Sequence, residues 1–91
     1  MRLTQLRSFH AVATTGSFTG AAEKLHVSQP TVTTQVGQLE ALYNVELFHR
    51  TGRRVRPTEV GERLAHLSRQ IFSLEADAIQ QIGRASCRER V

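Results

Sequence analysis

Apolar residues recur every three or four positions in the first part of the chain, the spacing that places side chains on one face of an α-helix. Residues 3–14 are therefore predicted to form an amphipathic helix. It is expected to end before Gly16, because glycine readily adopts the left-handed conformation of a helix C-terminus. Ser17 can cap a second, short helix through its hydroxyl group. The apolar positions of these two helices are Leu3, Leu6, Phe9, Val12, Ala13, Phe18, Ala21, Ala22 and Leu25.

A third helix is expected to follow Ser28, a second N-cap candidate, with Pro30 in its first turn, where a missing N–H costs nothing. One face of this helix is apolar and the other is small, polar and uncharged. Amides and hydroxyls donate and accept hydrogen bonds, as the base edges in a DNA groove require. About three residues around His26 separate it from the second helix, which gives the helix-turn-helix pattern. The apolar positions are Val32, Val36, Leu39 and Tyr43, and the polar ones are Gln29, Thr33, Thr34, Gly37 and Gln38.

The second half of the chain predicts a hairpin and a long helix. Alternation between Val45 and Pro57 indicates two strands, with Thr51–Gly52 at their turn. Thr58 can cap a helix over residues 58–82, which at ~1.5 Å per residue is roughly 37 Å long. Such a helix exceeds what the preceding domain can cover, so a second copy is the expected partner; packing back onto its own domain, or onto a domain that is missing here, is the alternative. Its apolar seam comprises Val60, Leu64, Leu67, Ile71, Leu74 and Ala78, widened by Phe72, Ile79 and Ile82.

Composition narrows the possible classes of protein. A chain of 91 residues has room for one small domain and an extra helix. No apolar run approaches the ~18 residues of a membrane span, and the N-terminus lacks the apolar core of a signal peptide. The single cysteine, Cys87, excludes an internal disulfide framework and points to a reducing cytoplasm. The histidines at positions 10, 26, 49 and 66 do not have the spacing of metal ligands, so no metal site is expected. Clusters of catalytic residue types are scarce as well, so neither a cofactor nor an enzymatic activity is expected.

Basic residues are concentrated in the predicted hairpin. The net charge is +4, and four arginines lie within the seven residues from Arg50 to Arg56. Such clustering is typical of a surface that binds a polyanion. A solvated hairpin tip accounts for the charge equally well, but the uncharged polar face of the preceding helix favours a nucleic acid.

The order of these residues resembles the N-terminal domain of LysR-type transcriptional regulators over roughly residues 2–82. The resemblance is nearly free of gaps, so it is far more specific than a helix-turn-helix pattern alone. It is carried by Leu6–Phe9, Gly16–Thr19, Ala21–Ala22, Leu25–Pro30, Gln35, Leu39–Glu40, Val45–Phe48, Arg50, Thr51–Arg54 and Thr58–Gly61.

The resemblance implies a mainly α fold, a winged helix-turn-helix with a two-stranded wing followed by a long linker helix. It divides the chain into a DNA-binding domain (1–57), a linker or dimerisation helix (58–82) and a tail (83–91). It also implies a homodimer that binds double-stranded DNA at an interrupted palindrome near a promoter. Such a protein acts in the cytoplasm, at the bacterial nucleoid, and has no membrane partner. Family members carry a C-terminal domain that binds a small-molecule inducer and completes a tetramer, so this chain is expected to be a fragment. The expected dimer contacts are Leu64, Leu67, Ile71, Leu74 and Ala78.

Carried over position by position, the resemblance assigns DNA contacts to two elements. Gln29, Pro30 and Thr33 match residues that enter the major groove. Arg50 and Arg53 match wing residues near the DNA backbone and minor groove.

The sequence departs from the family pattern on the recognition helix. Thr34 and Gly37 stand where long basic residues are frequent. Affinity is therefore expected to come mostly from the wing, to which Arg54 and Arg56 are added on charge alone. Base readout is expected to depend on Gln29, Thr31, Thr33 and Thr34.

Three alternatives stay open at this level: a module that binds only other proteins, an accessory domain of an enzyme acting on nucleic acid, and a different winged-helix family. The four arginines beside an uncharged helix face argue against the first, and the lack of catalytic groups against the second. The tail 83–91 breaks the periodicity of the linker helix and changes composition abruptly. It is interpreted as foreign to the natural protein.

Overall fold

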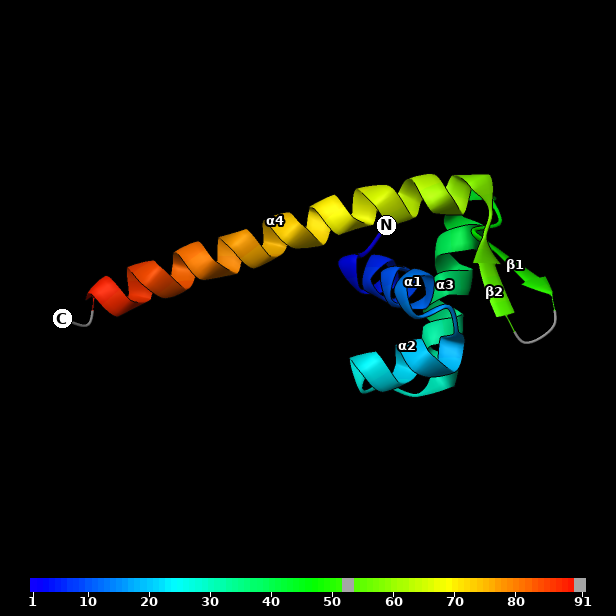
Figure 1. Cartoon of the computed structure of the whole chain (residues 1–91), viewed down its shortest axis with the longest axis horizontal. Helices are drawn as coiled ribbons and strands as arrows, with labels where there is room; N and C mark the ends of the chain where they lie inside the picture. The colour runs from blue at the N-terminus through cyan, green and yellow to red at the C-terminus, as the bar shows by residue number, and fades with distance from the viewer. Residues whose placement is uncertain (52–53, 90–91) are drawn as a thin grey trace.

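A computed structural model describes residues 1–51 and 54–89 of the chain. In this part the fold is mainly α-helical with a two-stranded antiparallel wing, as predicted. Figure 1 shows three short helices packed into one body, the wing at one end of it, and a long helix that runs past the body and projects beyond it. The elements are α1 (Leu3–Thr15), α2 (Phe18–Leu25), α3 (Gln29–Tyr43), β1 (Phe48–Thr51), β2 (Arg54–Pro57) and α4 (Glu59–Glu89).

The helix ends form as the sequence predicts. The hydroxyl of Ser17 accepts a hydrogen bond from the backbone N–H of Gly20 (2.8 Å), and that of Ser28 accepts one from Thr31 (3.3 Å). His26, between α2 and α3, adopts the left-handed conformation with φ 58°. These caps and this turn hold α2 and α3 in the helix-turn-helix arrangement.

The core lies between α1, α2 and α3 and is closed by the chain leading into the wing. Its buried apolar residues are Leu6, Phe9, Ala11, Val12, Ala21, Ala22, Val32, Val36, Leu39, Leu47 and Phe48. Two residues assigned to the apolar stripes are exposed: Leu3 (53%) and Tyr43 (55%). Tyr43 ends α3, and Asn44 turns the chain back in the left-handed conformation. Leu47 and Phe48, which follow this turn, are both buried in the core.

The wing is one residue longer on its first strand than predicted. Thr51 pairs with Arg54 at the end of the ladder, whereas the sequence placed it in the turn. The remaining predicted turn residue, Gly52, lies outside the described residues. In this register Arg50 is opposite Val55, and His49 is opposite Arg56. Since paired residues share a face and neighbours alternate, Arg50 and Arg56 lie on opposite faces of the wing.

Helix α4 is longer than predicted. It runs from Glu59 to Glu89, 31 residues, and not only over residues 58–82. A glycine inside a helix costs about 1 kcal/mol and does not by itself end it. Gly83 is therefore accommodated, and the change in composition after it does not coincide with the end of the helix. The foreign origin of the tail stays a prediction.

Candidate nucleic-acid interface

The exposed face of α3 carries the residues predicted to read DNA. Gln29, Pro30, Thr33 and Thr34 are exposed, and Thr31 is half-buried. An open hollow on this face is lined by Pro30, Thr31, Thr34, Gln35 and Gln38. The prediction included neither Gln35 nor Gln38 among the contacts, although Gln38 was placed on the polar face. The spacing of positions 31, 34 and 38, three and four residues apart, indicates that Gln38 shares a helix face with two of the predicted contacts.

Several polar groups at the start of α3 are already hydrogen-bonded. The Thr33 hydroxyl donates to the backbone carbonyl of Gln29 (3.1 Å), so it presents an acceptor oxygen and a methyl group to the outside. The Gln29 side-chain oxygen accepts from the Thr19 hydroxyl of α2 (3.3 Å). Its amide nitrogen is the group left to donate. These bonds restrict the rotamers of the side chains before any ligand arrives.

The arginine cluster is divided by the wing. Arg54 and Arg56 are exposed on one face. The Arg50 guanidinium turns the other way, 5.1 Å from the ring centre of Phe18 and 3.4 Å from a carboxylate oxygen of Glu40. Arg53 lies outside the described residues. Arg50 thus contacts the body of the domain, while its side chain is still 52% exposed.

Glu40 fixes the base of the wing against α3. One carboxylate oxygen accepts the backbone N–H of Leu47 at 2.8 Å, and the other accepts from Arg50 at 3.4 Å. An exposed ion pair contributes about 0–1 kcal/mol, but the bond to a backbone amide also sets geometry. Glu40 therefore orients the wing relative to the recognition face.

Helix α4 has two adjacent apolar sides rather than one seam. Leu64, Ala65 and Phe72 pack against the core of their own domain. Leu64 is therefore partly buried against its own domain, and its assignment as a dimer contact stays a prediction. The apolar residues left exposed are Val60, Leu67, Ile71, Leu74, Ile79 and Ile82, with the small Ala78 among them. One side of the helix is covered by its own domain, as one of the two alternatives predicted, whereas the pairing of the uncovered side with a second copy stays a prediction.

Ionic and aromatic contacts fasten the first half of α4 to α1. The Arg7 guanidinium donates to both oxygens of Glu75, at 2.8 and 3.0 Å, and lies 4.8 Å from the ring centre of Phe72. The His10 ring lies 5.1 Å from the same ring. Of these contacts, the one at Glu75 lies furthest along α4, and the helix projects beyond the body of the domain (Figure 1).

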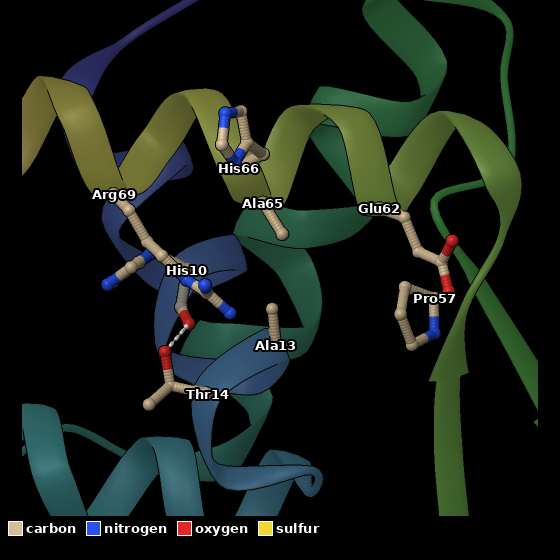
Figure 2. Close-up of a pocket in the computed structure, with 8 residues that line it drawn as sticks. All are labelled: His10, Ala13, Thr14, Pro57, Glu62, Ala65, His66 and Arg69. Atoms are coloured by element: carbon tan, nitrogen blue, oxygen red, sulfur yellow. Dashed lines mark hydrogen bonds between the residues drawn. The ribbon is translucent and has the colours of Figure 1, made fainter.

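A hollow of about 320 Å³ lies between α1, α4 and the end of β2 (Figure 2). It is lined by His10, Ala13, Thr14, Pro57, Glu62, Ala65, His66 and Arg69, none of which is a predicted DNA contact. At its edge the nearly inaccessible Ser68 hydroxyl donates to the Ala65 carbonyl (2.8 Å). That hydroxyl can then only accept from His10 Nδ1, 2.8 Å away. The hollow therefore belongs to the joint between α1 and α4.

Acid is expected to destabilise this joint through His10. Burial lowers the pKa of His10 below its usual 6.5, and the charges of Lys24, Arg69 and Arg7 lower it further. Below pH 6.5 the imidazole of the unfolded chain binds a proton, whereas that of the folded chain does not until the pH is lower. The free energy of unfolding therefore keeps the full contribution of His10 above pH 6.5 and loses it as the pH falls toward the pKa of the folded state. Thermal unfolding between pH 7.5 and 5 should show a shallower fall in Tm for His10→Gln than for the unmodified chain. Thr4→Ala, at an exposed position of α1 without a titratable group, should keep the original slope; equal slopes for all three proteins would contradict this role.

The described part of the chain contains no helix with the length and apolar composition of a membrane span. Nor does any group of three potential metal ligands come together in that part of the chain.

Comparison with known proteins gives a consistent assignment. The family described as bacterial regulatory helix-turn-helix protein, lysR family, matches residues 3–62. The RuBisCO operon transcriptional regulator of Allochromatium vinosum is 52% identical over 69 residues, which are 76% of this chain and 23% of that protein. An uncharacterised HTH-type transcriptional regulator in the ibpB-leuC intergenic region of Azotobacter vinelandii is 46% identical over 77 residues, which are 85% and 54% of the two chains. The chain thus spans about a quarter to about half of the length of these curated relatives.

Solved structures agree in fold. The DNA-binding domain of BenM, in a complex with catB site 1 DNA, superposes with a TM-score of 0.88 at 31% identity, covering 94% of this chain and 96% of that one. The DNA-binding domain of CbnR, also in a DNA complex, superposes with a TM-score of 0.82 at 36% identity, covering 94% of this chain and 99% of that one. Both the sequence match and the fold extend over most of the chain. The protein therefore belongs to the LysR family of bacterial transcriptional regulators, as a helix-turn-helix DNA-binding domain and not an enzyme.

Proposed function

We propose that this chain reads double-stranded DNA with α3 in the major groove, while the wing contacts the backbone and minor groove. The observation that carries the proposal is the uncharged hydrogen-bonding face of α3 beside the exposed Arg54 and Arg56. A face of hydroxyls and amides suits base edges, whereas guanidinium groups suit phosphates. The DNA-binding domains of BenM and CbnR, which share the fold, were solved in complexes with DNA, and this supports DNA as the ligand.

The proposal extends to a homodimer on an interrupted palindrome near a promoter. Two copies would pair antiparallel along the uncovered apolar side of α4, from Leu67 to Ala78. A palindrome presents two equivalent half-sites, so a two-fold symmetric dimer reads both with the same residues. In a full-length protein of this family we propose a further domain that binds a small-molecule inducer and completes a tetramer, with the assembly acting at the cytoplasmic nucleoid.

Selection from a random pool of DNA duplexes, followed by sequencing, tests this function. We expect enrichment of two inverted half-sites about one helical turn apart, with T/A at their ends. Fluorescence anisotropy at two salt concentrations should then show tighter binding of the enriched duplex than of a scrambled one, and steep weakening with salt for both. Salt-sensitive binding without enrichment would contradict sequence-specific reading. Absence of binding to any duplex would favour a protein-interaction module.

Specificity and affinity are expected to separate between α3 and the wing. Gln29→Ala should relax the preference at one base position by about 1–3 kcal/mol and leave the salt dependence unchanged. Arg54→Ala should weaken every duplex similarly and reduce the salt slope by about one. Arg84→Ala, which removes an exposed arginine from the projecting half of α4, serves as the control and should change neither quantity. Equal, sequence-independent losses for Gln29→Ala and Arg54→Ala would contradict this division.

A further inference from the structure

A chain of hydrogen bonds runs from the start of α1 to the exposed face of α3. The backbone N–H of Arg2 donates to the side-chain oxygen of Gln5 at 3.1 Å. The amide nitrogen of Gln5 donates to the side-chain oxygen of Gln38 at 3.2 Å. One turn further along α1, the buried Ser8 hydroxyl donates in the same way to the side-chain oxygen of Gln35. Two glutamines of α3 are thus held through their oxygens by α1.

The direction of this chain is fixed by its first member. A backbone N–H can only donate, so Gln5 must present its oxygen to Arg2. The other half of the Gln5 amide is then a pure donor, and Gln5 is only 8% exposed, which restricts rotation of its side chain. Facing a donor, Gln38 must present its oxygen inward. Its Nε2 group, with two N–H bonds, is left outward.

Gln38 stands on the face that α3 offers to DNA. It is exposed, and it lines the same open hollow as Pro30, Thr31 and Thr34. A glutamine with free rotation pairs with adenine through one donor and one acceptor at once. Because the Gln38 oxygen is turned inward to Gln5 and one of its two lone pairs is occupied there, the outward side of the amide offers N–H groups rather than the matched donor and acceptor.

We propose that Gln38 is a donor-only contact to DNA, and that Gln5 is the positioning residue that gives it this character. Its ligands are hydrogen-bond acceptors: the O6 and N7 atoms of guanine, or a phosphate oxygen. It disfavours adenine, which needs the matched donor and acceptor. The inference rests on the proposed placement of α3 against the bases. It adds one DNA contact to that placement, and this contact depends on a residue of α1.

Two substitutions at position 5 and one at position 38 test the proposal on the duplexes obtained by selection. Gln38→Ala should weaken binding about two- to tenfold, the effect of one lost hydrogen bond. Gln5→Glu supplies acceptors only, so the Gln38 amide must turn over and present its oxygen to the DNA. We expect Gln5→Glu to weaken binding at least as much as Gln38→Ala. Gln5→Met, which frees Gln38 without adding charge, should raise the relative affinity for adenine at the contacted position.

The control for added charge is Thr4→Glu, which places a carboxylate on the neighbouring, exposed residue of α1. Gln5→Glu should weaken DNA binding more than Thr4→Glu does. This difference in affinity between the two variants should vanish when both substitutions are made in a chain that already carries Gln38→Ala. A purely structural role of Gln5 predicts the same difference in both backgrounds and would overturn the inference. Thermal unfolding of each variant shows that the compared proteins are folded, and Gln38→Ala, at an exposed site, tests the contact independently of the α1 substitutions.

The pattern of losses identifies the acceptor. A Gln38→Ala loss confined to duplexes with guanine at one position assigns a base edge, and a uniform loss over all duplexes assigns a phosphate. Wild-type binding by Gln38→Ala on every duplex overturns the inference. If Gln29→Ala still relaxes specificity in that case, the placement of α3 stands. If both variants bind like the wild type, the placement of α3 fails as well.

Discussion

Gly61→Ala is expected to lower the free energy of unfolding by about 3 kcal/mol, the upper range for forcing extra atoms into a filled site. A Cβ atom at Gly61 would lie 2.1 Å from the carbonyl oxygen of Leu47 and 3.2 Å from the Pro57 side chain. The Leu47 carbonyl cannot withdraw freely, because it accepts the backbone N–H of Thr58 at 2.9 Å. The first turn of α4 would have to move away from the base of the wing. Urea denaturation followed by circular dichroism measures the loss.

The matched control for Gly61→Ala is Gly83→Ala in the same helix. A Cβ atom at Gly83 meets nothing within 4 Å, so the substitution should instead stabilise the helix by up to about 1 kcal/mol. If Gly61→Ala unfolded at the same urea concentration as the unsubstituted chain, the close packing of α4 on the wing would be disproved. The control separates this steric effect from the general effect of adding a methyl group to α4.

Leu74→Ala is expected to raise the dissociation constant of the proposed dimer at least 100-fold. Leu74 is 67% exposed in the single chain, and pairing along α4 would bury it twice, once in each copy. Loss of two buried leucine side chains costs about 3–6 kcal/mol, which corresponds to roughly 100-fold or more in dissociation. Sedimentation over a range of protein concentrations measures this change. Binding to a single half-site should be unaffected, since Leu74 belongs to α4 whereas the proposed DNA contacts belong to α3 and the wing.

Gln80→Ala provides the control for the dimer, because Gln80 is also exposed but lies outside the apolar side of α4. It should leave the dissociation constant within a factor of about two, the usual range for a surface substitution. A monomeric unsubstituted chain at high concentration would contradict the proposed pairing. Identical dissociation of Leu74→Ala and the parent dimer would show that pairing uses another surface.

Local signals predicted the parts of the fold that depend on neighbouring residues. Ser17, Ser28 and Thr58 each bond to a backbone N–H three residues further on, so their role follows from the sequence around them. The left-handed conformations of Gly16 and His26 are equally local. The order of elements and the family followed from the same runs of residues.

Contacts between distant residues account for what the sequence could not supply. The periodicity of α4 shows that Leu64 and Leu67 are apolar, but not that only Leu64 faces its own domain, since that depends on where α1 crosses. Arg50 was recognised by its charge, yet its direction is set by Glu40, ten residues away. The donor character of Gln38 depends on Gln5, 33 residues earlier in the chain. A charge or a period in the sequence carries no information on such pairings.

The anchoring of α4 at one end makes it a lever. The helix is about 46 Å long at ~1.5 Å per residue, and its contacts with α1 end near Glu75. The 14 residues beyond Glu75 span about 21 Å, so a tilt of about 10° where the anchored part ends would displace the far end of the helix by roughly 4 Å, about the rise of one base pair of DNA. In the proposed dimer, small changes in how Arg7 and Phe72 meet would be magnified into the distance between the two recognition helices. A change of angle at the joint between α1 and α4 would thereby allow one dimer to bind operators whose half-sites are spaced differently.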